Sequence, residues 1–251
     1  MTAADDHAVA EELARDAGTL LVALREDLTL KGFDQRSIKN AGDRESHVWL
    51  MERLTELRPE DPVLSEEGRD NSHRLSSSRA WIVDPLDGTR EYGEGREDWA
   101  VHVALAIDGE PLVGAVSLPS LGRVLSTANP PVLPERPEGQ PPRLVVSRSR
   151  APFVAHAVAE ALDAEFIQMG SAGAKAMAVV LGIADIYVHA GGQYEWDNCA
   201  PAAVALAAGL HASRIDGSPM RYNRADPYLP DLLICRKEFA QPVLELISGL
   251  F

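Results

Sequence analysis

The spacing of apolar residues predicts two helices at the start of the chain and a group of strands after them. Apolar positions recur every three or four residues over 6–28 and over 43–57, which is the period of an amphipathic helix. Short apolar runs, one pair of them joined by the turn sequence Asp108-Gly109, then predict strands. These expected strands are 63–64, 80–83, 99–108, 112–118 and 122–127.

A proline-rich segment divides the chain. Six prolines fall within residues 126–143, which is typical of an exposed connector between domains. After it, apolar runs alternate in the order strand 143–147, helix 151–163, strand 165–168, helix 172–182, strand 184–189 and helix 198–209. This alternation indicates an α/β layer. We therefore expect an α+β domain with an antiparallel sheet over 1–142 and an α/β domain over 143–251.

Composition narrows the class of protein. The 251 residues are 45% hydrophobic and carry a net charge of −14, which is typical of a globular chain. Because nucleic acid and anionic membranes both require a basic footprint, we expect neither as a partner. The longest apolar runs are shorter than the roughly 20 residues that span a bilayer, and the first residues are acidic. We expect a cytoplasmic protein.

The cysteine content excludes two classes of small-domain scaffold. Cys199 and Cys235 are the only two cysteines, too few for a disulfide framework or a four-thiolate zinc site. A single bridge between them stays open.

Carboxylates follow the predicted strand at 80–83. The segment Asp84-Pro85-Leu86-Asp87-Gly88-Thr89 places two aspartates three positions apart, and carboxylate and carbonyl oxygens are the ligands that Mg²⁺ and Ca²⁺ prefer. Taken alone, the segment is equally compatible with a surface Asp-Pro turn. The nucleophile motif of haloacid-dehalogenase-type phosphatases fits less well, because its aspartates are two apart and near the N-terminus.

Two further acidic segments favour a site. Glu66-Glu67 follows the strand expected at 63–64, and Tyr194-Glu195-Trp196-Asp197 follows a Gly-Gly pair. Either segment alone would be interpreted as a solvated charge run. The three together predict one carboxylate cluster.

In this order, Glu66-Glu67, the segment 84–89 and Trp196-Asp197 resemble the signature of the lithium-sensitive inositol monophosphatase superfamily. That superfamily includes inositol monophosphatases, fructose-1,6-bisphosphatases and 3′(2′),5′-bisphosphate nucleotidases. The segments 42–44, 170–175, 189–197 and 216–231 are most similar to the actinobacterial CysQ type, which acts on 3′-phosphoadenosine 5′-phosphate (PAP).

The resemblance implies a fold and an activity. The fold is the layered α-β-α-β-α sandwich of sugar phosphatases. The activity is Mg²⁺-dependent hydrolysis of PAP to AMP and phosphate, and of the related phosphosulfate PAPS to APS, in sulfate assimilation. A homodimer is also expected, because homodimers are common among relatives.

The resemblance further implies two or three Mg²⁺ ions and their ligands. These ligands are Glu66, Asp84, Asp87, Asp197 and the carbonyl of Leu86. The physical logic agrees, because a chain of charge −14 needs local positive charge to attract a bisphosphate. Asp87→Asn is expected to abolish activity with little effect on folding.

Catalytic roles follow from the same resemblance. The attacking water is expected to be oriented by Glu66 and Thr89, with Asp43 as the base. The alternative for Asp43 is an N-cap of the helix expected at 43–57. The backbone N–H groups of Gly88 and Thr89 are expected to cradle the scissile phosphate.

Other residues are candidates for the rest of the substrate. Tyr194 and Glu195, with Asp197, are expected to face its sugar or base. Ser171 and Lys175 are candidates for the second phosphate or the ribose, although Lys175 is equally compatible with a solvent-exposed lysine. Positive potential for the non-scissile phosphate is expected from one of two sets, which are Ser147, Arg148 and Arg150, or Arg221 and Arg224. His102 and His189 are expected to be core residues.

Two alternatives stay open at this point. An inositol monophosphatase or a fructose-1,6-bisphosphatase would use the same metal core with another pocket. A non-catalytic nucleotide- or metal-binding regulator is a second class, which the presence of all the acidic residues disfavours.

Overall fold

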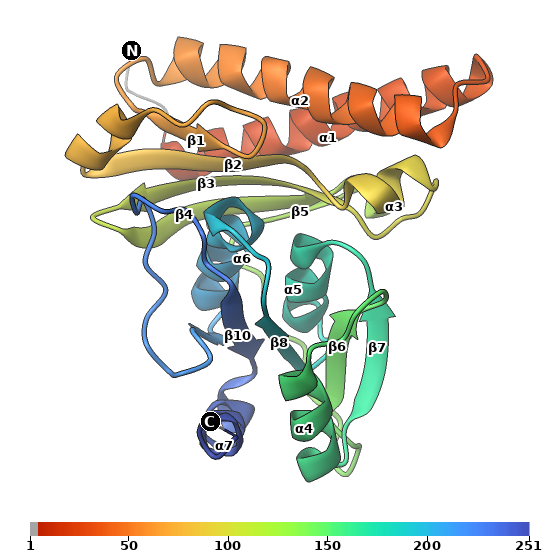
Figure 1. Ribbon diagram of the computed structural model, residues 1–251, viewed down its shortest axis with the longest axis vertical. Helices are drawn as coiled ribbons and strands as arrows, with labels where there is room; N and C mark the ends of the chain where they lie inside the picture. Colours follow the sequence, from red (N-terminus) through yellow and green to blue (C-terminus); the bar gives the residue numbers. More distant parts are fainter. Residues whose placement is uncertain (1–4, 251) are drawn as a thin grey trace.

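The computed structural model describes residues 5–250 and contains two five-stranded sheets (Figure 1). The first sheet has the order β1 (Val63–Ser65), β2 (Arg79–Asp87), β3 (Ala100–Ile107), β4 (Glu110–Leu118) and β5 (Arg123–Ser126). The second has the order β7 (Glu165–Met169), β6 (Arg143–Ser147), β8 (Ile186–Ala190), β10 (Asp231–Cys235) and β9 (His211–Ser213). All pairs in the first sheet are antiparallel except β1–β2.

Helices form three layers around these sheets. The outer face of the first sheet carries α1 (Asp6–Leu30) and α2 (Gln35–Leu57), and the middle layer holds α5 (Ala172–Val180) and α6 (Glu195–Ala207). The far layer holds α4 (Phe153–Leu162) and α7 (Lys237–Ser248). Short helices occur at α3 (Thr89–Gly93), η1 (Ser72–Ser76) and η2 (Pro119–Leu121). The expected α-β-α-β-α sandwich is confirmed.

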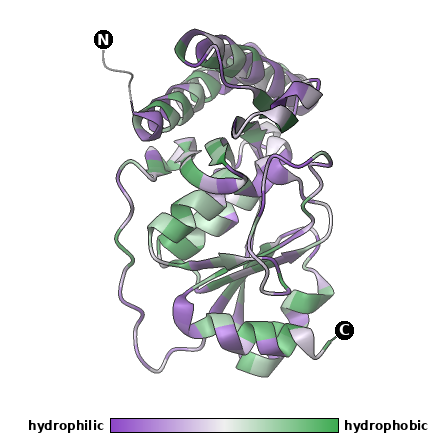
Figure 2. Cartoon of the chain, turned by 90° about the vertical axis from the view of Figure 1, so that its left-hand side faces the viewer, coloured by the Kyte–Doolittle hydropathy of each residue, from purple (hydrophilic) through white to green (hydrophobic). Residues whose placement is uncertain are grey.

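Burial explains the colouring of these layers in Figure 2. The helix α1 buries only one stripe, which includes Val9, Leu13, Ala17 and Leu21, so polar and apolar residues alternate around it. The middle helix α5 is buried along its whole length and is apolar except for Lys175. None of the described helices is long and apolar enough to cross a membrane.

The second helix begins earlier than its apolar pattern predicts. α2 starts at Gln35, where the Asp34 side chain accepts the backbone N–H of Ser37 at 2.8 Å and caps the helix. Its first two turns are mostly polar, so the hydrophobic period does not register them. The N-cap alternative for Asp43 is therefore wrong, because Asp43 lies inside α2.

The strand β2 is longer than predicted and carries a bulge where the acidic segment lies. Asp84 pairs with His102 and Asp87 pairs with Ala100, so β2 contains one more residue than β3 between these two pairs. Residues three apart in a regular strand point to opposite faces, and one extra residue restores a common face. The bulge therefore turns both aspartates toward the middle layer.

The two sheets share a core. One hydrophobic cluster joins residues of β3 and β4, such as Ala104 and Val116, to residues of the second sheet, such as Tyr187 and Ile234. The segment between β5 and β6 is irregular, as its prolines predict. The division into two domains at residue 142 stays a prediction. Cys199 and Cys235 are both free and buried, so they do not form a bridge.

Close packing of α6 on β4 depends on Gly114. A Cβ atom at this position would lie 2.7 Å from the Ala203 Cβ and 2.9 Å from the Ala200 carbonyl oxygen. We predict that Gly114→Ala lowers the free energy of unfolding by about 1–3 kcal/mol, because the helix must move away from the sheet. Gly249→Ala is the control, since its Cβ would have no neighbour closer than 3.6 Å. Equal denaturation midpoints for the two variants would contradict this account of the packing.

Candidate active site

Three aspartates from distant parts of the chain converge at the bulge of β2. Asp84 and Asp87 come from β2, Asp197 comes from the first turn of α6, and one oxygen of each lies within 4.8 Å of the others. Asp84 is only 1% exposed. Buried carboxylates this close together repel one another strongly, so the cluster could hold a divalent cation.

Glu66 extends the cluster from the end of β1. It follows β1 directly, and although the residue as a whole is exposed, its carboxyl group lies against the buried Asp84 carboxyl group. Burial and the neighbouring carboxylates raise the pKa of Glu66 to about 7 and the pKa of Asp197 to about 7. The same two causes raise the pKa of Asp84 well above its usual range.

Asp87 differs from its neighbours because it accepts hydrogen bonds from the start of α5. The Ser171 hydroxyl and the backbone N–H groups of Ala172, at 3.1 Å, and Gly173, at 2.6 Å, donate to its carboxylate. Burial by itself disfavours the charge, but His102 and these donors outweigh burial and hold the pKa of Asp87 below its usual range. Asp87 is therefore the member of the cluster that stays ionised.

His102 supports Asp87 from β3. Its Nε2 lies 3.2 Å from an Asp87 oxygen and its Nδ1 lies 3.0 Å from the Trp196 carbonyl oxygen. It is fully buried, as expected of a core residue, but nothing in the sequence indicates this contact. These contacts revise the expectation that Asp87→Asn has little effect on folding. The amide nitrogen of asparagine would face hydrogen-bond donors, so the substitution would also destabilise the fold.

Asp43 approaches the cluster from α2. It is half-buried, and burial together with Glu67 raises its pKa to about 7. One turn further along α2, His47 Nδ1 lies 3.0 Å from the Ser65 hydroxyl, which ties the helix to the end of β1. The acidic site therefore draws on three separate elements of the first half and one of the second.

The turn after Asp87 requires glycine. Gly88 has a φ of 85°, and a Cβ there would lie 3.1 Å from the Ser171 Cβ and 3.3 Å from the Asp98 carbonyl oxygen. Thr89 is the first residue of α3 and is half-buried. The backbone thus reverses direction beside the cluster without a side chain in the way.

The side chains of two residues expected to bind substrate instead form hydrogen bonds with backbone groups of the protein. Lys175 is 5% exposed, and its ammonium group donates to the carbonyls of Gly170 and Ser171, so the solvent-lysine alternative is wrong. Glu195 is fully buried, and its oxygens accept the backbone N–H groups of Asn223 at 2.7 Å and Arg224 at 2.9 Å.

The Ser171 hydroxyl is also occupied by hydrogen bonds within the protein. Besides donating to Asp87, its hydroxyl accepts the backbone N–H of Ala174 at 2.9 Å and caps α5. Ser147 is half-buried at the end of β6, with its hydroxyl 3.3 Å from that of Ser149. Sequence spacing could not reveal these partners because they depend on how the chain folds.

The arginines expected to bind the non-scissile phosphate differ in whether their side chains form ion pairs. Arg148 pairs with Glu91 and Glu94 across the two halves, and Arg221 pairs with Glu110. The side chains of Arg150 and Arg224 make no hydrogen bond or ion pair within residues 5–250. One arginine of each predicted set is therefore available.

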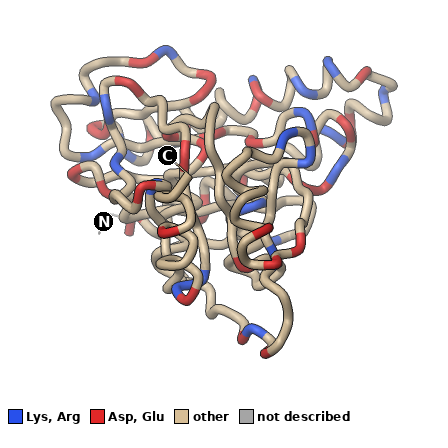
Figure 3. Tube along the Cα trace, turned by 60° about the horizontal axis from the view of Figure 1, so that its bottom comes forward, with Lys and Arg blue, Asp and Glu red and all other residues tan. Residues whose placement is uncertain are grey.

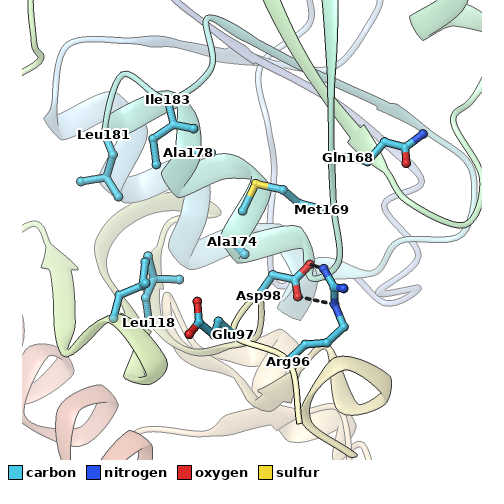
Figure 4. A pocket seen from close by; sticks show the side chains of 11 residues that line it. Arg96, Glu97, Asp98, Leu118, Gln168, Met169, Ala174, Ala178, Leu181 and Ile183 are labelled. Atoms are coloured by element: carbon cyan, nitrogen blue, oxygen red, sulfur yellow. Dashed lines mark hydrogen bonds and ion pairs between the residues drawn. The ribbon is translucent and has the colours of Figure 1, made fainter. Parts of the chain in front are cut away.

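An apolar cavity elsewhere in the molecule is not this site. It has a volume of about 400 Å³ and lies beside α5, with Leu118, Met169 and Leu181 in its wall and the Arg96–Asp98 ion pair at one end (Figure 4). No carboxylate of the cluster lines it. Its mainly apolar wall also offers few ligands for a cation or a phosphate.

Comparisons with known proteins agree on one family. A sequence model of the inositol monophosphatase family matches residues 4–131 and 135–245. The 3′-phosphoadenosine 5′-phosphate phosphatase of Mycobacterium bovis is 50% identical, with 93% of this chain and 90% of the relative aligned. The 3′(2′),5′-bisphosphate nucleotidase CysQ of Escherichia coli is 30% identical over 87% of this chain and 94% of its own. Among solved structures, CysQ from Bacteroides thetaiotaomicron has a TM-score of 0.78 at 25% identity, covering 92% of this chain and 97% of its own.

The repulsion within the cluster predicts how stability depends on pH. Because folding raises the pKa of Glu66 and Asp197 from 4.5 and 3.8 to about 7, the cation-free protein is stabilised below pH 4 and loses this contribution as pH rises to about 7. The melting temperature in EDTA should therefore fall between about pH 5 and about pH 8, and Mg²⁺ should reverse the fall at the higher pH.

Asp84→Asn serves as the test variant for this prediction. It should shrink the fall in EDTA and remove the response to Mg²⁺, whereas Glu160→Gln on the exposed face of α4 should leave both unchanged. A wild-type melting temperature that ignores Mg²⁺ at high pH would show that the cluster holds no cation.

Proposed function

This chain belongs to the inositol monophosphatase family, and we propose that it hydrolyses the 3′-phosphate of PAP to give AMP and inorganic phosphate. The observation that carries the proposal is the convergence of Asp84, Asp87 and Asp197 in a chain 50% identical to a PAP phosphatase. By the same chemistry we propose that it converts PAPS to APS and so acts in sulfate assimilation. The cytoplasmic location and the homodimer stay predictions.

The residues present fit a divalent metal. The cluster is an all-oxygen donor set, and the mutual repulsion of its carboxylates is relieved by a cation. We propose that Glu66, Asp84, Asp87, Asp197 and the Leu86 carbonyl hold two or three Mg²⁺ ions. Bound Mg²⁺ would neutralise the phosphoryl oxygens, activate water and stabilise the leaving oxygen. Inhibition by Li⁺ is expected as well.

The chain's own groups would position and deprotonate the water. Asp43 would accept a proton from the attacking water at its carboxylate, with Glu66 and the Thr89 hydroxyl orienting that water. The Gly88 and Thr89 N–H groups would point at the scissile phosphate, at a turn that only glycine fits. His102 and the start of α5 would keep Asp87 ionised and in place.

The positive charge available for an anionic substrate comes from a few individual arginines and not from a broad basic surface. In the view of Figure 3, Lys and Arg are interspersed with Asp and Glu and do not form a separate basic face. Arg150 and Arg224, whose side chains are unpaired within residues 5–250, are the candidates for the 5′-phosphate. This arrangement fits a small bisphosphate and not a nucleic acid.

A substrate profile tests the proposed function. Phosphate release from PAP, inositol 1-phosphate and fructose 1,6-bisphosphate would be measured with the purified protein, with and without Mg²⁺. We expect the highest kcat/KM for PAP and no release in EDTA. Preference for inositol 1-phosphate would overturn the nucleotidase assignment, and no turnover of any substrate would favour a non-catalytic regulator.

The role of Asp43 generates a separate prediction. Asp43→Asn should lower kcat for PAP by about 100-fold or more, because the base is lost, with little change in KM. Asp34→Asn is the matched control on the same helix, since asparagine can also cap α2. If both variants kept wild-type kcat, Asp43 would not be the base.

A further inference from the structure

Ser171 has a backbone conformation that residues with side chains rarely adopt. Its φ is 43° and its ψ is 136°, which lies outside the three main regions open to L-amino acids. Strained conformations of this kind persist only where the surrounding structure over-determines them, and they are concentrated at functional sites. Ser171 is the N-cap of α5, the helix whose start donates to Asp87, so the strain lies at the edge of the carboxylate cluster.

The strained turn connects one peptide group to Asp87 and to Lys175 at the same time. In the peptide between Ser171 and Ala172, the N–H donates to Asp87 at 3.1 Å and the carbonyl accepts from the Lys175 ammonium group. The N–H and the carbonyl of a trans peptide point in opposite directions, so the two bonds hold the peptide plane from both ends. The ammonium group also donates to the Gly170 carbonyl at 3.0 Å. Because Lys175 is only 5% exposed, these carbonyls compensate the burial of its charge.

Asp98 holds the residue that precedes the strained one. Its carboxylate accepts the Gly170 N–H at 2.6 Å and pairs with Arg96, whose Nε lies 2.7 Å away (Figure 4). The Asp98 side chain is 10% exposed, whereas that of Arg96 is 42% exposed. A hydrogen bond from a backbone N–H to a carboxylate is charge-assisted and stronger than an ordinary backbone bond. This bond therefore fixes the point at which the chain enters the turn.

Two glycines let neighbouring groups pack closely against the same turn. A Cβ at Gly170 would lie 2.3 Å from the Cδ of Glu91, and a Cβ at Gly173 would lie 2.0 Å from the Nε2 of His102. Glu91 is itself held by Arg148, whose Nε donates to it at 2.7 Å. Hydrogen bonds at both ends and close packing on two sides thus supply the restraint that a strained residue requires.

We propose that Asp98 and Lys175 are positioning residues of the metal site, which hold Ser171 in its strained conformation and so keep the start of α5 donating to Asp87. This inference rests on the proposed function and deepens it. Neither residue belongs to the carboxylate cluster. A carboxylate fixed by three donors is held in one orientation before Mg²⁺ binds, so less conformational freedom is lost on binding. Without the two restraints, Ser171 would relax and the donors would turn away from Asp87.

Hydrogen exchange in EDTA tests the proposal without metal or turnover. Asp98→Ala and Lys175→Met should each speed the exchange of the Ala172 and Gly173 amides at least about tenfold, because these amides lose Asp87 as their acceptor. The amides of β8, which is paired on both sides within the second sheet, should exchange as in the wild-type protein. Equal acceleration in β8 would mean that the substitutions only destabilise the fold, and it would overturn the proposal.

Two matched variants isolate the bond between Asp98 and the turn. Asp98→Asn should keep most of the protection, because the amide oxygen can still accept the Gly170 N–H. Arg96→Gln removes the ion pair and leaves that acceptor in place, so it should exchange as the wild-type protein does. If Arg96→Gln lost as much protection as Asp98→Ala, the ion pair and not the bond to Gly170 would hold the turn, and the proposal would be wrong.

The dissociation constant for Mg²⁺, measured by calorimetry, is the second readout. It should rise about tenfold or more in Asp98→Ala and Lys175→Met, the range typical of residues that orient a metal ligand. Val154→Ala is the control, because it truncates a buried residue of α4 and lowers stability without contact with the turn. A purely structural role would lower the melting temperature and leave the dissociation constant unchanged, as expected for this control.

These measurements separate the positioning role from the proposed function. If PAP were not hydrolysed but exchange and Mg²⁺ binding changed as expected in Asp98→Ala and Lys175→Met, the positioning role would stand and the activity would fall. If PAP were hydrolysed but both variants exchanged and bound Mg²⁺ as the wild-type protein does, the positioning role would fall and the activity would stand.

Discussion

The repulsion between buried carboxylates at the bulge of β2 is the constraint on which the rest of this structure depends. Asp84, Asp87 and Asp197 lie within 4.8 Å of one another, where three negative charges cannot coexist without compensation. The fold compensates the negative charges of these carboxylates unequally. Asp87 receives donors from His102 and the start of α5 and stays ionised, whereas Asp84, Asp197 and Glu66 hold protons more tightly than usual. A bound cation would complete the compensation and release those protons.

Each layer of the sandwich contributes one part of this arrangement. The first sheet delivers two aspartates on one face through its bulge, and α2 brings Asp43 from the outer layer. The middle layer closes the site, because α5 supplies donors for Asp87 and α6 supplies Asp197. Close packing of α6 on β4 at Gly114 therefore matters for the site as well as for stability.

The start of α6 connects the carboxylate cluster to the loop that follows Tyr222. Asp197 belongs to the carboxylate cluster, the Tyr194 ring packs against the rings of Trp196 and Tyr228, and Glu195 between them accepts hydrogen bonds from the loop that leads to Tyr228. Here the Glu195 carboxylate is occupied by the backbone N–H groups of that loop.

Strong apolar periods were enough to predict most helices and strands. The three acidic segments, through the resemblance that they carry, predicted the α-β-α-β-α architecture. The apolar pattern did not reveal that α2 begins with polar turns, so an N-cap stayed open as the alternative for Asp43. It also did not reveal the bulge that turns Asp84 and Asp87 to one face. The partners of Glu195 and His102 lie far away in the chain, and the burial of Lys175 results from packing around α5, so the local pattern could not predict them. The local apolar pattern specifies which segments form helices and strands. Tertiary packing specifies which groups hydrogen-bond to or neutralise each charged side chain.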